Sequence, residues 1–178
     1  LVGELQQHKQ ALLAFLRAGQ TNGTHAPIQP VARTGDLPLS YAQERLWFLD
    51  QLGGGSAYNM AGALKLVGPL DVSVLQQSLN EIVRRHEVLR TTFTRVTDAA
   101  GQRTVQVIAA HAQVALPLLD LHSLAAADQS SEVQRFAKNE AHRPFDLTQD
   151  LMLRVTLLRL AAESHILLLT FHHIASDG

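Results

Sequence analysis

The stretch that decides the fold reads His172-His173-Ile174-Ala175-Ser176-Asp177-Gly178, and it follows the apolar run from Ile166 to Phe171. The run is short and rich in leucine, which predicts a strand buried in a core. Two imidazoles stand where the run stops, and a carboxylate and a glycine follow them. Residue types that move protons or bind ligands therefore gather at the end of a buried strand, and we predict a functional site there.

The two adjacent histidines are expected to serve different roles, because neighbouring strand residues point to opposite faces. One imidazole would face a ligand and accept a proton or hold a reacting group, while the other packs. Three interpretations stay open: acid–base or positioning chemistry, metal binding, and structural histidines. Metal binding is less favoured, because the two rings are expected to point apart and no other His, Cys or carboxylate cluster lies close in sequence. Asp177 is costly to bury unpaired, which predicts a cationic partner elsewhere.

The composition is that of an ordinary folded domain. The chain has 178 residues, of which 46% are hydrophobic and 17% charged, enough for one sizeable core. A net charge of −1, with no basic run interleaved with aromatics, argues against nucleic acid or an anionic membrane as partner. No apolar stretch is long enough to span a bilayer, and no signal peptide is apparent. The absence of cysteine excludes a disulfide framework and a thiolate nucleophile, and we expect a cytoplasmic protein.

The beginning of the chain predicts three segments. Residues 2–18 place leucines near helical spacing, which predicts an amphipathic helix over 1–18. This helix would have a structural role, either packing on its own domain or forming a frayed end of the chain. Alternatively, it would recognise a partner. Residues 19–38 are rich in Gly, Thr, Asn and Pro and predict a linker. The main domain is expected over 39–178, and we expect the chain to be part of a longer protein.

The main domain mixes helices and strands without strict alternation. Ser40 and Gln43 form a predicted capping box, which opens a helix whose Trp47 and Phe48 are expected in the core. Further helices are expected after Asp71 and over 125–142; strands are expected at 61–67, 89–96, 103–109, 114–119, 151–160 and 165–171. The last two strands should form an antiparallel pair in the middle of a sheet. The pattern predicts an α+β sandwich in which helices cover one face of a mixed sheet.

Three separated stretches resemble the conserved motifs of the condensation domains of nonribosomal peptide synthetases. They are Leu39-Ser40-Tyr41-Ala42-Gln43-Glu44-Arg45-Leu46-Trp47-Phe48-Leu49, Arg85-His86-Glu87-Val88-Leu89-Arg90-Thr91-Thr92-Phe93, and Phe171 to Gly178. Pro144-Phe145-Asp146-Leu147, before the strand that holds Arg154, is also typical of that family. The histidine motif is similar to that of chloramphenicol acetyltransferase-like acyltransferases generally.

The resemblance implies the N-terminal lobe of a two-lobed, chloramphenicol acetyltransferase-like domain, with the second lobe absent from this chain. In the family, a tunnel between the lobes admits two phosphopantetheine arms of carrier proteins. The amine of an acceptor aminoacyl thioester attacks a donor acyl thioester and an amide forms. The implied partners are upstream and downstream carrier domains, the C-terminal lobe and neighbouring synthetase domains. No cofactor and no metal would be bound by this chain directly.

The same resemblance implies roles for individual residues. His173 would face the reacting amine, as a general base or as a positioning group, and His172 would pack on the other side of the strand. The Gly178 N–H would stabilise the tetrahedral oxyanion. Asp177 would be structural and pair with Arg90, with Arg85 as the second choice. Arg90 could instead be a solvated strand residue.

Further expectations concern the subtype and the ends of the chain. The pattern Ser-x-Ala-Gln-x-Arg-Leu-Trp at 40–47 looks like the subtype that joins two L-configured residues. The helix over 1–18 weakly resembles the end of a docking domain, which would recognise an upstream synthetase subunit. The alternatives are a non-catalytic fragment that only binds a carrier or docks, and another acyltransferase of the same superfamily. Residues 1–178 alone are expected to be inactive.

Overall fold

The computed structural model describes residues 29, 32, 35–99 and 101–176. The chain divides into two compact units, Leu1–Thr34 and Gly35–Gly178, and the second unit contains nearly all of the described residues. The helix expected over 1–18 lies outside the described residues, as does most of the expected linker. In the described ranges, no helix combines the length and the apolar character that a membrane span needs.

The larger sheet of this unit has four strands in the order β2 (Asn59–Val67), β7 (Ser164–His172), β6 (Leu153–Ala161) and β5 (Leu118–Asp120). β7 pairs antiparallel with both β2 and β6, whereas β5 runs parallel to β6. The expected antiparallel pair in the middle of a mixed sheet is confirmed. The two inner strands are the apolar ones, as strands buried on both faces should be.

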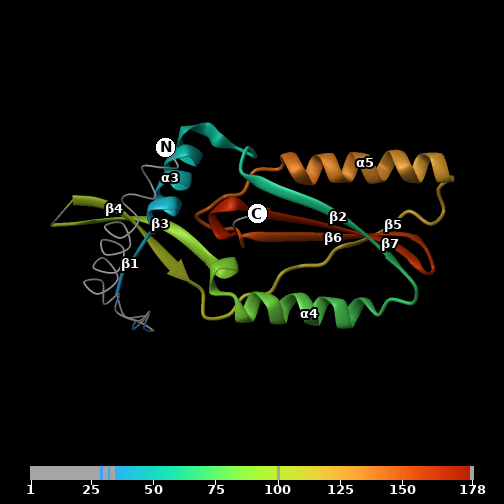
Figure 1. The fold of residues 1–178 in the computed structure, drawn as a ribbon, viewed down its shortest axis with the longest axis horizontal. Helices are drawn as coiled ribbons and strands as arrows, with labels where there is room; N and C mark the ends of the chain where they lie inside the picture. The colour runs from blue at the N-terminus through green and yellow to red at the C-terminus, as the bar shows by residue number, and fades with distance from the viewer. Residues whose placement is uncertain (1–28, 30–31, 33–34, 100, 177–178) are drawn as a thin grey trace, which may run out of the picture. The chain divides into compact units, whose positions relative to one another are not determined.

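Each face of this sheet carries one helix, and Figure 1 shows α4 (Val72–Arg85) and α5 (Ala126–His142) on opposite sides of it. The α4 face holds a cluster that contains Leu79, Val83, Leu153, Val155, Leu157 and Leu167. The α5 face holds a cluster that contains Val133, Phe136, Leu158, Leu168 and Ile166. The α+β class is confirmed, but the expectation that helices cover one face is wrong. Both alternating sets of β6 and β7 side chains contain buried leucines, so both faces need a cover.

A second, three-stranded sheet has the order β1 (Leu37–Pro38), β4 (Gly101–Ile108) and β3 (Thr91–Asp98). β1 pairs with β4, so the last two residues of the expected linker belong to the folded unit. The 3₁₀ turn η2 (Glu87–Arg90) leads from α4 into β3. The two strands β3 and β4 form the expected hairpin, with Asp98 opposite Gly101.

The helix α3 (Tyr41–Leu49) begins with the predicted capping box: the Gln43 backbone N–H donates to the Ser40 hydroxyl, and the Gln43 side chain accepts from the Ser40 N–H. It continues into the short π-helical turn η1 (Asp50–Gly54). Trp47 is buried, as expected, but Phe48 is 61% exposed and its expected place in the core is wrong. Successive helical residues are about 100° apart, so Phe48 lies about 200° around the helix from Leu46, and the side that buries Leu46 and Trp47 leaves Phe48 outside.

The strand expected at 114–119 is shorter than predicted, because only Leu118–Asp120 pairs with β6. The preceding backbone is held by α4 instead. The Gln76 side chain donates to the Val114 carbonyl at 2.6 Å, and the Val114 N–H donates to Asn80 Oδ1 at 3.0 Å. Two long-range side-chain bonds therefore satisfy the backbone groups that a strand ladder would otherwise use.

The C-terminal end of α5 is held by side chains of the sheet. Asn59 Nδ2 donates to the carbonyls of Ala141 and Arg143, both at 2.8 Å. Arg154 donates to the carbonyls of Glu140 at 3.3 Å and Arg143 at 2.6 Å. The last carbonyls of a helix have no partner within the helix, so these donors replace a local cap.

We expect Asn59→Ala to lower the free energy of unfolding by about 1–2 kcal/mol, because two carbonyls lose their donor in a half-buried place. Urea unfolding of the complete chain measures this. Asn139→Ala, at an exposed position of the same helix, is the matched control and should change stability by less than about 0.5 kcal/mol. Equal effects of the two substitutions would contradict the role of Asn59 as a cap.

Candidate active site

The histidine pair lies where β7 ends and the 3₁₀ turn η3 (His173–Ala175) begins. The backbone at this point is held from two sides: the His172 N–H donates to the Met152 carbonyl at 3.3 Å, and the His173 N–H donates to the Tyr58 carbonyl at 2.9 Å. The change from extended to 3₁₀ backbone occurs between the two histidines. The two rings therefore have different surroundings because His173 has left the strand, and not because two strand residues alternate between faces.

His172 is a core residue, with 1% of its surface exposed. Its ring lies edge-on to Phe145 at a centroid distance of 5.7 Å and is 6.4 Å from the Tyr58 ring. Its Nδ1 accepts the Ile174 N–H at 3.1 Å. A nitrogen that accepts carries no proton, so neutral His172 holds its proton on Nε2, which is buried and has no hydrogen-bond partner among the described residues.

The surroundings of His172 favour this neutral form. Burial away from water lowers the pKa of His172 to about 4, and the nearby His173 and Arg154 act in the same direction. Desolvation is the largest of these causes. At neutral pH the ring is therefore uncharged and remains able to accept the Ile174 N–H.

His173 is half-buried and has a different hydrogen bond. Its Nδ1 lies 2.6 Å from the Ser176 carbonyl oxygen. A carbonyl can only accept, so the proton of neutral His173 is on Nδ1, and Nε2 keeps a free lone pair. An imidazole held in this tautomer can accept a proton or a hydrogen bond at Nε2.

His173 lines an open pocket of about 350 Å³, together with Ser40, Ala42, Gln43, Leu46, Val88, Gln106, Ile174, Ala175 and Ser176. These residues come from α3, η2, β4 and the turn of the histidine motif. Two of the lining side chains are amides that hydrogen-bond to each other: Gln43 Nε2 donates to Gln106 Oε1 at 3.3 Å. Gln106 Nε2 in turn donates to the Pro38 carbonyl at 2.7 Å. The first sequence motif and the third therefore meet in one pocket.

Arg90 makes contacts other than the predicted one among the described residues. It donates to the carbonyls of Ala109 and Arg84 and forms an ion pair with Glu87 at 3.8 Å, with 12% of its side chain exposed. It is therefore not a solvated strand residue. Asp177 and Gly178 lie outside the described residues, so the Asp177–Arg90 pair and the oxyanion role of the Gly178 N–H stay predictions.

The second choice for the Asp177 partner, Arg85, is 68% exposed and bonds Glu81 at 2.7 Å. Across the described part of the chain, no three His, Cys, Asp or Glu side chains come together in a way that would hold a metal ion. The structure thus brings His173 into the lining of a pocket, buries His172, and leaves both His172 and Arg90 outside the set of residues that line that pocket.

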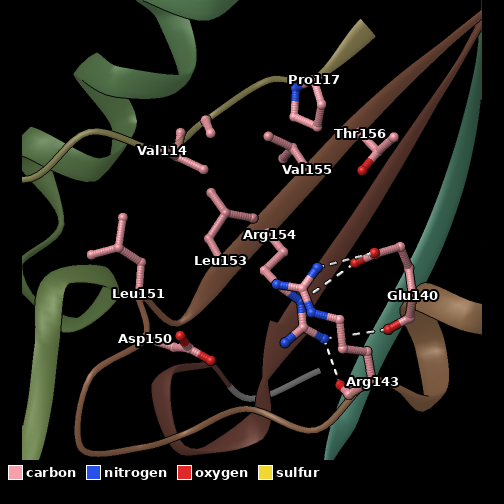
Figure 2. Close-up of a pocket in the computed structure, with 11 residues that line it drawn as sticks. Val114, Pro117, Glu140, Arg143, Asp150, Leu151, Leu153, Arg154, Val155 and Thr156 are labelled. Carbon is pink, nitrogen blue, oxygen red and sulfur yellow. Dashed lines mark hydrogen bonds and ion pairs between the residues drawn. The ribbon is translucent and has the colours of Figure 1, made fainter. Parts of the chain in front are cut away.

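Sequence reasoning assigned no role to Arg154, whose side chain is only 11% exposed. Figure 2 shows it pointing from β6 toward Glu140 and Arg143. Its guanidinium lies 3.7 Å from the centre of the Phe145 ring, the same ring that contacts His172. The signal that could have found it is an arginine in the mostly apolar strand β6, because a buried charge needs several partners. That signal alone does not separate Arg154 from Arg159, which stands in the same strand.

Comparison with known proteins adds a family assignment. The profile of the Condensation domain family matches residues 33–178. The chain is 47% identical over 165 residues to chondramide synthase cmdD of Chondromyces crocatus, covering 92% of this chain and 4% of that protein. It is 42% identical over 152 residues to malpinin synthetase of Mortierella alpina, covering 85% of this chain and 2% of that protein.

Solved structures agree with this assignment. The starter condensation domain of rhizomide synthetase RzmA superposes with a TM-score of 0.70 at 26% identity, covering 82% of this chain and 34% of that one. The X-domain from teicoplanin biosynthesis superposes with a TM-score of 0.69 at 33% identity, covering 84% of this chain and 30% of that one. The chain thus spans about a third of these structures and a small fraction of the synthases. With motifs, fold and family profile in agreement, the chain belongs to the condensation-domain family.

Proposed function

We propose that this chain is part of a domain that forms amide bonds in nonribosomal peptide synthesis. The observation that carries the proposal is His173: its ring lines a pocket, and its Nδ1 is engaged with the Ser176 carbonyl, so Nε2 keeps its lone pair. Membership of the condensation-domain family and the similarity to peptide synthases support it. The donor and the acceptor would be thioesters on the phosphopantetheine arms of carrier proteins.

In the proposed reaction, the acceptor amine attacks the donor thioester carbon; a C–N bond forms and the C–S bond breaks. The nitrogen loses a proton, and the departing thiolate gains one. His173 Nε2 accepts a hydrogen bond from the amine and takes its proton as the C–N bond forms, then returns a proton to the thiolate. A positioned base of this kind contributes about 10²–10⁴-fold to a rate.

The remaining assignments belong to the same proposal. His172 packs behind the site, Asp177 and Arg90 are structural, and the Gly178 N–H stabilises the oxyanion. The residues joined are both L-configured, and the protein acts in the cytoplasm with upstream and downstream carriers and the second lobe. The segment 1–18 recognises an upstream synthetase.

We expect His173→Ala in the complete synthetase to slow dipeptidyl-thioester formation by about 10²–10³-fold, because the amine loses its proton acceptor. Single-turnover assays with both carriers loaded measure this. His122→Ala is the matched control, since His122 is exposed and lies in the loop after β5, away from the pocket residues. Turnover of the His173→Ala protein at the wild-type rate would instead favour the non-catalytic, carrier-binding alternative.

The packing role of His172 predicts a pH dependence of stability. The unfolded ring has a pKa near 6.5 and the folded ring a pKa of about 4, so the unfolded state binds more protons between these values. The contribution of His172 is therefore complete above pH 6.5 and is lost as the pH falls toward 4. It amounts to about 3 kcal/mol at most.

Urea unfolding of the wild type and of His172→Phe at several pH values measures this contribution. Carboxylates also titrate at the acidic end, but they do so in both proteins. The wild type should therefore lose more stability than the variant between pH 6.5 and pH 4. Parallel curves for the two proteins would mean that His172 is not held neutral by the fold.

A further inference from the structure

Arg154 is a buried cation that no part of the proposed chemistry uses. It lies in β6 opposite Thr170 of β7 and donates to the carbonyls of Glu140, Arg143 and Pro144 at 2.6–3.3 Å. Its Nε lies 3.4 Å from Glu140 Oε2, as the dashed lines of Figure 2 show. One side chain therefore ties the end of α5 and the turn after it to the strand that precedes β7.

The same guanidinium is in contact with the histidine pair through one ring. Phe145 lies between Arg154, which is 3.7 Å from the ring centre, and His172, which meets the ring edge-on at 5.7 Å. His172 Nδ1 in turn accepts the Ile174 N–H, the bond that opens the turn carrying His173. A continuous series of contacts thus leads from Arg154 to the backbone that orients His173.

We propose that Arg154 is a positioning residue: through Phe145 and His172 it holds the turn that aims the His173 ring into the pocket. The inference rests on the proposed function and extends it. Its physical basis is that His172 can accept the Ile174 N–H only while Nδ1 is unprotonated. A fixed positive charge on the far side of Phe145 disfavours a second positive charge on His172.

Two groups near His172 disfavour a positive charge on it: His173, whose effect is the larger, and Arg154. Tyr58, before β2, and Phe145, after α5, present rings to it, and His173 is its neighbour in the chain. Glu140 of α5 is engaged with Arg154 itself. Without the guanidinium, His172 would take up a proton at higher pH and release the Ile174 N–H.

The test compares Arg154→Met, Arg154→Lys and the control Arg159→Met in the complete synthetase. Arg159 lies in the same strand but is paired with Asp120 and 42% exposed. For each protein, kcat and KM of amide formation are measured against pH. For Arg154→Met we expect kcat to fall about tenfold at neutral pH with KM nearly unchanged, because a slightly misplaced ring slows chemistry more than binding.

The pH profile separates positioning from a merely structural role. In Arg154→Met the acidic limb of the kcat profile should move to higher pH, because His172 then takes up a proton more readily and its protonation disrupts the turn. Arg154→Lys keeps the positive charge but loses the planar guanidinium and its paired donors. It should therefore return the acidic limb of the kcat profile to its wild-type pH and recover only part of kcat. A limb that stays in place in Arg154→Met, with kcat lowered equally at all pH values, would overturn the inference.

A second readout does not depend on the reaction. The rate at which diethyl pyrocarbonate modifies His173, mapped by mass spectrometry, reports the access and nucleophilicity of its ring nitrogens. We expect severalfold faster modification in both Arg154 variants and no change in Arg159→Met.

The failure of the inference can be told from the failure of the proposed function. If His173→Ala leaves turnover intact, the proposed function fails whatever the Arg154 variants show. If His173 is essential but neither its modification rate nor the acidic limb changes when Arg154 is substituted, only the inference about Arg154 fails. If Arg154→Met does not fold, the kcat and the modification rate of Arg154→Lys provide the test.

Discussion

The burial of the Arg154 guanidinium is the interaction on which the arrangement around the histidines depends. Burial lowers the pKa of Arg154, but the pKa of an arginine is so high that the group stays charged at any ordinary pH. Its charge must therefore be met by partners, and the structure supplies carbonyls at the end of α5, the Glu140 carboxylate and the face of Phe145. A cation near the C-terminal end of a helix is also favoured by the helix dipole. One side chain thus links the end of α5 to β6, the neighbour of the histidine strand.

The two histidines have different roles because the backbone changes from extended to 3₁₀ between them. The strand delivers His172 to the α5 face, where water is excluded and the neutral ring becomes an acceptor for the backbone. The 3₁₀ turn that this bond opens carries His173 out of the strand and lets its Nδ1 donate to Ser176. Each ring therefore has one tautomer fixed by the backbone, and the free Nε2 lone pair of His173 is a consequence of how the turn closes.

The sequence predicted what local patterns determine. The capping box at Ser40 and the apolar strands both follow from spacing over a few residues. The wrong expectations involve contacts distant in the chain. Phe48 is exposed because α3 covers the core with one side, and Val114 leaves the sheet because Gln76 and Asn80 of α4 bind its backbone. Arg154 binds the Glu140 and Arg143 carbonyls from another part of the chain, so the strand pattern did not show what it binds.

The pocket shows why a small second sheet belongs to the site. Its wall is built from α3 and β4, which are far from the histidine motif in sequence, and the amides of Gln43 and Gln106 link them to Pro38 of β1. Gln43 also serves as the acceptor for the Ser40 N–H at the start of α3. The same side chain therefore begins the helix and faces the pocket of His173, so a motif needed to start a helix also determines what lies opposite the imidazole. A substitution at Gln43 would change both, which is why the first motif and the histidine motif are coupled physically although they stand near opposite ends of the folded unit's sequence.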